Sequence, residues 1–147
     1  MQLEVDRPVA ATRILLVDDY PDALEIWGLY LRAMGYDVVE ADDGLKAVAQ
    51  AHRHHPDIIV LDLELPGITG FEAAIRLRNS AETRHIPLIA ATGYSQATQL
   101  DQARASGFDA IVVKPCEPAL LVAEIERLLQ LSRARQFAAV KHVSQNR

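Results

Sequence analysis

Short apolar runs recur five times along this chain, and segments with helical spacing separate them. The runs are about the length of a strand and are rich in valine and isoleucine. They lie at Ile14–Val17, Val38–Val39 with Tyr36 before them, Ile58–Leu61, Leu88–Ala91 and Ile111–Val113. Three of the runs are apolar without alternation, which is typical of strands covered on both faces of a parallel sheet. The pattern therefore predicts an α/β fold, a doubly wound parallel sheet of five strands with helices on both faces.

Apolar residues at helical spacing mark the segments between these strands. The predicted buried stripes contain Leu24, Trp27 and Leu31; Leu45, Val48, Ala49 and His52; Phe71, Ala74, Ile75 and Arg78; and Leu121, Ile125, Leu128 and Leu129. The segment Ser95–Ser106 has the weakest pattern, with Leu100 and Ala103 as its buried candidates, so we expect it to be the loosest helix. Past Leu131 the pattern fades, and we expect a disordered end there.

Length and composition exclude several classes of protein. A chain of 147 residues, 50% hydrophobic and 24% charged, fits one globular domain rather than a disordered segment or a coiled coil. A single cysteine, Cys116, excludes an internal disulfide and a cysteine zinc cluster. The formal net charge of -5 does not favour direct binding of nucleic acid. Since no apolar run approaches the roughly 20 residues of a membrane span and no signal peptide is present, we expect a cytoplasmic protein.

Polar residues follow four of the five predicted strands. Asp18 and Asp19 come after the first run, Asp62 ends the third, Thr92 follows the fourth and Lys114 the fifth. In parallel α/β sheets ligands bind beyond the carboxyl ends of the strands, where these residues converge. Three carboxylates there repel one another unless a cation lies between them, and hard oxygen ligands suit Mg2+. The hydroxyl and the ammonium suit a phosphoryl group, so the sequence predicts phosphoryl transfer to an aspartate, best placed at Asp62.

Taken together, the motifs at these strand ends resemble the receiver domain of response regulators in two-component signalling. The motifs are ILLVDDYPD at Ile14–Asp22, IIVLDLELPGITGFE at Ile58–Glu72, ATGY at Ala91–Tyr94 and VVKPCEP at Val112–Pro118. The resemblance covers about Thr12 to Leu131. It implies a flavodoxin-like three-layer sandwich of five helices and five parallel strands in the order 2-1-3-4-5.

The resemblance divides the chain into three segments. It implies a flexible N-terminal extension at residues 1–11, the receiver domain at residues 12–131 and a basic tail at residues 132–147. The tail has 4 basic and no acidic residues, whereas residues 1–131 have 11 basic and 20 acidic ones. Because no output domain fits in the remaining length, we expect a single-domain response regulator that acts through protein contacts or passes the phosphoryl group on.

The resemblance also assigns roles to the metal-binding and accepting residues. Asp62 matches the phosphoacceptor, which takes its phosphoryl group from a phosphohistidine. Asp19 and Asp62 match the ligands of Mg2+, Asp18 the acid that acts through a water, and Glu64 the position whose backbone carbonyl completes the site.

Two further residues match the groups that contact the phosphoryl group. Thr92 matches the hydroxyl that moves toward it and Lys114 the lysine that pairs with it. In such domains the bond between Lys114 and Pro115 is usually cis.

This chain departs from the common receiver pattern near the switch. The family often has an aromatic residue three positions before the lysine, where this chain has Ile111, so aliphatic repacking near Ile111 and Ile89 would replace the aromatic switch. Glu64 and Tyr94 flank the expected path of the attacking water. We expect these two residues to tune the lifetime of the phosphoryl group.

The expected partners are a sensor histidine kinase or a histidine phosphotransfer protein, a downstream protein target, and a second copy through the fourth and fifth helices. The chain is expected to act as a switch rather than an enzyme, apart from phosphorylation and autodephosphorylation at Asp62. One alternative is a haloacid-dehalogenase-like phosphatase, although that family typically has an aspartate where Glu64 stands. Another is a degenerate receiver that works without phosphorylation.

Overall fold

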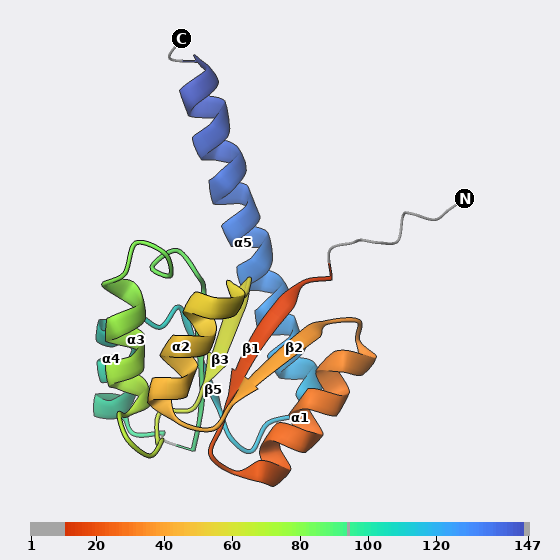
Figure 1. Ribbon diagram of the computed structural model, residues 1–147, viewed down its shortest axis with the longest axis vertical. Coiled ribbons are helices and arrows are strands. Elements are labelled where there is room, and N and C mark those ends of the chain that lie inside the picture. The colour runs from red at the N-terminus through yellow and green to blue at the C-terminus, as the bar shows by residue number, and fades with distance from the viewer. Residues whose placement is uncertain (1–10, 94, 146–147) are drawn as a thin grey trace.

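The computed structural model describes residues 11–93 and 95–145, which form one sheet covered by helices (Figure 1). The strands are β1 (Arg13–Val17), β2 (Asp37–Ala41), β3 (Ile58–Leu61), β4 (Leu88–Thr92) and β5 (Ala110–Val113). The helices are α1 (Pro21–Ala33), α2 (Gly44–His54), α3 (Gly70–Arg78), α4 (Ala97–Ser106) and α5 (Pro118–Gln145). All strand pairs are parallel, and the predicted order β2-β1-β3-β4-β5 is confirmed. Among the described residues, no helix has both the length and the apolar character of a membrane span.

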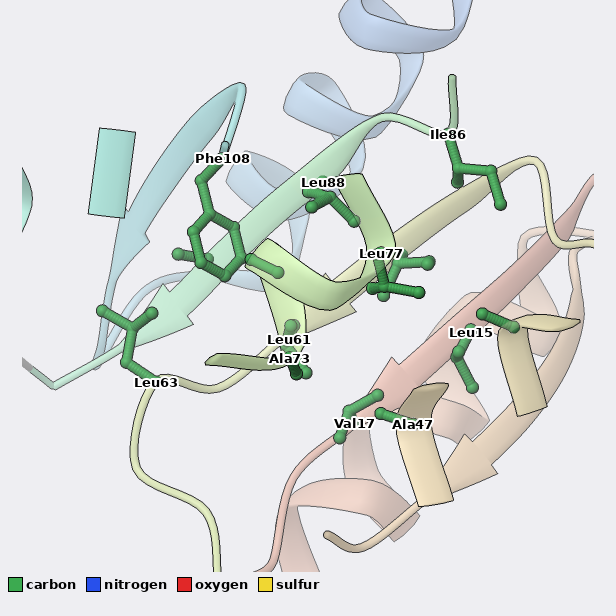
Figure 2. Packing of buried hydrophobic residues seen from close by; sticks show 14 of the residues in the cluster. Leu15, Val17, Ala47, Leu61, Leu63, Ala73, Leu77, Ile86, Leu88 and Phe108 are labelled. Carbon is green, nitrogen blue, oxygen red and sulfur yellow. The ribbon is translucent and has the colours of Figure 1, made fainter. Parts of the chain in front are cut away.

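Two hydrophobic cores lie on opposite faces of the sheet, because successive side chains of a strand point to opposite sides. Leu15 and Val17 of β1 belong to one core, together with Ala47 of α2 and Leu77 of α3 (Figure 2). Ile14 belongs to the other core, which the residues of α1 and α5 complete. The apolar strands are therefore buried on both faces, as the runs without alternation predicted.

The predicted buried face of α2 is only partly right. Val48 packs against the core, but Leu45 is 53% exposed and Ala49 is also exposed, whereas Gly44, Ala47 and Ala51 are the buried residues of the helix. In α3, Ala74 is buried as predicted, but Ile75 is 46% exposed, and Ala73 and Leu77 are buried instead. Small side chains let these helices lie close to their neighbours, and a pattern based on large apolar residues overlooks them.

The expectation of a disordered end after Leu131 is also wrong for residues 132–145. The buried stripe Leu121, Ile125, Leu128 and Leu129 is confirmed, but α5 continues past it to Gln145 and projects beyond the sheet (Figure 1). Residues 132–145 contain neither proline nor glycine, so no local feature ends the helix. Arg133 also donates a hydrogen bond of 3.4 Å from Nη2 to the Thr12 hydroxyl, which ties the start of this extension to the domain.

The loop between β3 and α3 is held very close to the end of β3. The Gly70 amide donates to the Leu63 carbonyl at 2.9 Å. A Cβ atom at position 70 would lie 2.1 Å from the Asp62 carbonyl oxygen and 2.7 Å from the Leu63 Cα atom. Both neighbours are backbone atoms, so only glycine fits here. A capping box formed by Thr69 and Glu72 starts α3 at the same place.

We expect Gly70→Ala to destabilise the fold by about 1–3 kcal/mol, because the added methyl group must displace the backbone at Asp62. Chemical denaturation measures the free energy of unfolding. The matched control is Gly93→Ala, since a Cβ atom at Gly93 meets no atom of the described residues within 4 Å. Equal stability of the two variants would contradict the role of Gly70.

Candidate functional site at the carboxyl edge of the sheet

The parallel register brings the predicted site residues to one edge of the sheet. Val17, the last residue of β1, pairs with Leu61, the last residue of β3. Asp18 and Asp62 directly follow these two residues. Thr92 is the last residue of β4, and Lys114 follows β5. Four side chains that are far apart in the sequence therefore start from neighbouring strand ends.

Three carboxylates form a compact cluster at this edge. Asp18, Asp19 and Asp62 each offer one oxygen, and these oxygens all lie within 4.8 Å of one another. Asp18 is buried at 5% exposure, Asp62 is half-buried and Asp19 is exposed, so the cluster opens to solvent on the side of Asp19. Hard oxygen donors with an open side fit Mg2+, which prefers to keep several water ligands.

Lys114 is shared between two of the carboxylates. Its Nζ lies 2.5 Å from Asp18 Oδ2 and 3.4 Å from Asp62 Oδ2. Burial lowers the pKa of the Lys114 ammonium, but the hydrogen bonds and charges of Asp18 and Asp62 outweigh this effect and raise the pKa above its usual value. The lysine is therefore charged, yet one positive charge faces three carboxylates. The bond between Lys114 and Pro115 is cis, the isomer that the resemblance implies.

The Asp62 carboxyl has unusual surroundings for an aspartate. Burial raises its pKa and the neighbouring Asp18 adds to the rise, while the Glu64 amide and Lys114 act in the opposite direction without cancelling it. The Glu64 amide donates to Asp62 Oδ1 at 3.1 Å. Asp18 Oδ1 accepts from the Tyr20 amide at 3.0 Å, which fixes the carboxylate beside Asp62. A cation near Asp62 would favour its ionised form.

The remaining predicted residues lie around this centre. Thr92 is fully buried, and its carbonyl accepts from the Lys114 amide at 2.7 Å. The Glu64 side chain is exposed beside Asp62. Tyr94 lies outside the described residues.

The structure corrects the expected repacking between Ile111 and Ile89. Ala90, not Ile89, is the register partner of Ile111, so the two isoleucines point to opposite faces of the sheet and belong to different cores. Ile111 packs in the core that contains Ala103 of α4 and Phe108, which is 5% exposed (Figure 2). Phe108, three positions before Ile111, is therefore an aromatic neighbour in the same core, but it lies before the start of β5 and not at the carboxyl edge.

Sequence reasoning also missed Gly70, whose missing side chain lets the loop after Asp62 close. A glycine directly before an apolar helical segment was the available sign. The requirement became visible only with the distance to the Asp62 carbonyl.

Comparison with known proteins agrees with this site. Residues 14–126 match the family model of the response regulator receiver domain. The chain is 37% identical over 118 residues to the DNA-binding dual master transcriptional regulator RpaA of Synechocystis sp., covering 80% of this chain and 49% of that protein. It is 32% identical over 102 residues to the polar-differentiation response regulator DivK of Brucella ovis, covering 69% of this chain and 83% of that protein. The chain therefore spans about half the length of the first relative and most of the second.

A solved structure is similar as well. The receiver domain of the sensor histidine kinase PA1611 from Pseudomonas aeruginosa PAO1 is 32% identical, with a TM-score of 0.72 over 82% of this chain and 96% of that one. That structure has a magnesium ion coordinated in its active site cleft. The family model, the relatives and the fold agree, and the chain belongs to the response regulator receiver domain family.

Proposed function

We propose that Asp62 accepts the phosphoryl group of this receiver domain from a phosphohistidine on a histidine kinase or histidine phosphotransfer protein. Receiver domains are phosphoacceptors of two-component systems rather than classical enzymes. The observation that carries the assignment is the convergence of Asp18, Asp19 and Asp62 within 4.8 Å beside Lys114. Asp62 is the member that directly follows the central strand β3, and it is less buried than Asp18, which shares its contact with the lysine.

The donor set fits Mg2+, since three carboxylates face one ammonium at an edge open to solvent. In this proposal Asp19, Asp62 and the backbone carbonyl of Glu64 hold the ion, and Asp18 acts through a water. The ion would supply positive charge for the phosphoryl oxygens.

The chain's own groups complete the transfer. A carboxylate oxygen of Asp62 forms the new bond to phosphorus while the bond from phosphorus to the donor imidazole nitrogen breaks and leaves its electron pair on that nitrogen. The Lys114 ammonium pairs with a phosphoryl oxygen, and the Thr92 hydroxyl donates to another. After the transfer the negative charge lies on the phosphoryl oxygens. The Lys114 ammonium then moves from Asp62 Oδ2 toward a phosphoryl oxygen, and this movement displaces the end of β5.

We propose that this shift is read out at α4 and β5. Helix α4 buries only Ala103 and Ser106 among its residues, and Ile111 and Phe108 pack in the same core as Ala103. A small displacement of Thr92 or Lys114 thus changes a surface with few buried contacts, to which a downstream protein binds. A homodimer through α4 and α5 belongs to the same proposal.

A phosphodonor assay tests the acceptor. With Mg2+ and acetyl phosphate, we expect a base-labile, acid-stable label on the parent, no label on Asp62→Asn, and full label on the control Asp101→Asn, an exposed acid of α4. Absence of label on the parent would indicate a degenerate receiver. Multiple turnover of phosphomonoesters would indicate the haloacid-dehalogenase-like phosphatase, which neither the family match nor the fold supports.

Stability should depend on pH through Asp62. Because its pKa is raised in the folded chain, the ionised carboxyl destabilises the fold above that pKa when no divalent cation is present. We expect Asp62→Asn to melt at a higher temperature than the parent at about pH 7 in EDTA, with the difference vanishing as the pH falls below about 3.9, the ordinary value for aspartate. Mg2+ should raise the melting temperature of the parent more than that of the variant. A parent that is more stable at neutral pH in EDTA contradicts the raised pKa.

Glu64 and Tyr94 are proposed to tune the reaction at Asp62. The exposed Glu64 carboxylate repels an anionic donor, so Glu64→Gln should speed labelling by acetyl phosphate about two- to fivefold at low salt, with a smaller gain at high salt. Label formation over time measures the rate of labelling, and Glu82→Gln at the other end of the domain is the control.

The loss of label over time tests the proposed effect of Glu64 and Tyr94 on the lifetime of the phosphoryl group. If Glu64→Gln and Tyr94→Ala lose their label at the parent's rate, this part of the proposal is wrong.

A further inference from the structure

A cavity with a volume of about 530 Å³ lies at the end of the domain opposite Asp62. Pro87 and Asp109 line it, and they directly precede β4 and β5, so the cavity lies at the amino ends of these strands. Arg135 and Gln136 line it from α5, beyond the last buried residue of that helix. Among the described residues that line the cavity, none belongs to the site at Asp62.

Besides Arg78, three arginines from separate parts of the fold line this cavity. Arg84 comes from the loop between α3 and β4, Arg104 from α4 and Arg135 from the extension of α5, and all three are exposed. Within the described part of the chain, the side chains of Arg84 and Arg135 make no hydrogen bond or ion pair. Arg104 meets Asp101 at 3.5 Å, and both side chains of this pair are well exposed. Asp101 offsets part of the Arg104 charge, but four arginines line the cavity against one acid, Asp109, so the cavity carries an excess of positive charge.

Helix stabilisation does not explain this arrangement. A cation in the last turn of a helix is favourable, and Arg104 lies in the last turn of α4. Arg84 lies in a loop and Arg135 in the middle of α5, so the helix dipole accounts for neither. Like charges gathered around one cavity repel each other, and an anion bound between them relieves the repulsion.

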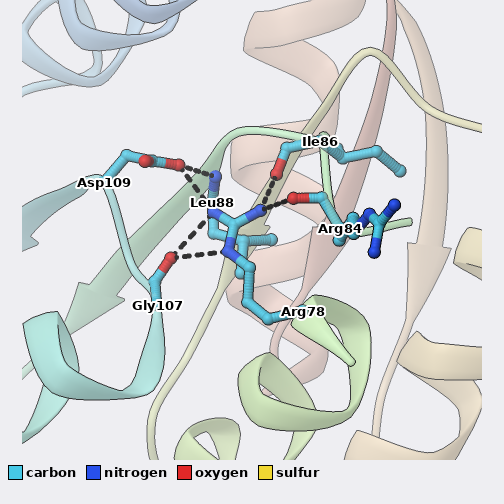
Figure 3. Close-up of polar contacts among 6 residues, drawn as sticks. All are labelled: Arg78, Arg84, Ile86, Leu88, Gly107 and Asp109. Atoms are coloured by element: carbon cyan, nitrogen blue, oxygen red, sulfur yellow. Dashed lines mark hydrogen bonds and ion pairs between the residues drawn. The ribbon is translucent and has the colours of Figure 1, made fainter. Parts of the chain in front are cut away.

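The wall of the cavity is rigid, because Arg78 locks its backbone (Figure 3). Its guanidinium donates to the carbonyls of Arg84 at 2.6 Å, Ile86 at 2.7 Å and Gly107 at 2.8 and 3.0 Å. It also pairs with Asp109 at 2.8 Å. The same Asp109 oxygen accepts from the Leu88 amide at 2.9 Å.

This network has two consequences for the cavity. The negative charge of Asp109 is neutralised by Arg78, so it does not oppose an anion. The loop that carries Arg84 is also fixed in place before any ligand arrives, which lowers the entropic cost of binding.

We infer that this cavity binds a small polyanion with at least two phosphate-type groups, held by Arg84, Arg104 and Arg135. Guanidinium groups bind phosphate oxygens through paired hydrogen bonds, and three of them exceed what one phosphate requires. The volume suits a small molecule. A long nucleic acid would also meet the remaining surface of the domain, and residues 1–131 as a whole have 20 acidic residues against 11 basic ones.

Such a ligand adds a third element to the two that Arg78 already connects at this end. It ties the loop before β4 and the end of α4 to the extension of α5. Binding therefore stabilises the fold and restrains α4, the helix at which we place the response to phosphorylation. The inference does not depend on Asp62, because the two sites share no residue.

Calorimetric titration of the full chain with inorganic pyrophosphate and triphosphate tests the inference. EDTA is present, and ionic strength is matched with sodium chloride. We expect saturable binding of one ion per chain. Triphosphate should bind more tightly than pyrophosphate, and both should bind more tightly than inorganic phosphate. Binding should also raise the melting temperature of the protein. Arg84→Ala and Arg135→Ala should each weaken triphosphate binding about tenfold or more. They should keep acetyl phosphate labelling at Asp62, which shows that they are folded.

Arg53→Ala and Arg76→Ala are matched controls, since both arginines are exposed on helices and lie outside the cavity. Their triphosphate affinity should equal that of the parent. The inference is overturned if the controls lose as much affinity as the cavity variants, or if the parent shows no saturable binding. If a single-stranded oligonucleotide binds more tightly than triphosphate at equal phosphate concentration, the inferred small ligand is wrong and the site binds a nucleic acid instead.

Discussion

The two ion pairs of Lys114 hold together the ends of three strands. The lysine follows β5, and its partners Asp18 and Asp62 follow β1 and β3. Parallel strands place all these ends at one edge of the sheet. Without the shared Lys114 ammonium, the carboxylates gathered there would repel one another more strongly. Burial keeps the pKa of Asp62 above its ordinary value even though the Glu64 amide and Lys114 lower it, so the ionised carboxyl is not fully stabilised by its surroundings. The site is therefore built to gain from added positive charge, which is the physical basis for both the proposed ion and the proposed chemistry.

The two ends of the domain differ in charge for a topological reason. In a parallel α/β fold the helices run opposite to the strands, so the helix C-termini gather at the amino ends of the strands. Cations are favourable there, and Arg78 and Arg104 both lie in the last turn of a helix. Arg84 and Arg135 add charge beyond this requirement. The domain thus has an acidic end that receives a phosphoryl group and a basic end suited to an anion, with α4 between them.

Local pattern predicted the strands well and the helix faces less well. In β1, β3 and β4 the apolar residues follow one another without a polar residue between them. These runs are strands in the structure, within one residue of the predicted bounds. The faces of α2 and α3 were only partly predicted, because alanine and glycine are weakly apolar and their burial depends on how closely the helix approaches its neighbours. The end of α5 was misplaced for another reason. A fading apolar stripe marks the loss of contact with the core, and the helix continues to Gln145 although none of residues 132–140 is buried.

The sequence by itself determined the receiver fold and the set of residues at the carboxyl edge, because both follow from the order of apolar runs and from what comes directly after each run. Only the tertiary structure decided which of these residues touch. It gave Lys114 two partners rather than one, closed the loop of Gly70 against Asp62, and separated Ile111 from Ile89. It also gathered Arg84, Arg104 and Arg135 around one cavity. Such contacts join residues far apart in the chain, and their distances depend on packing that no short pattern contains.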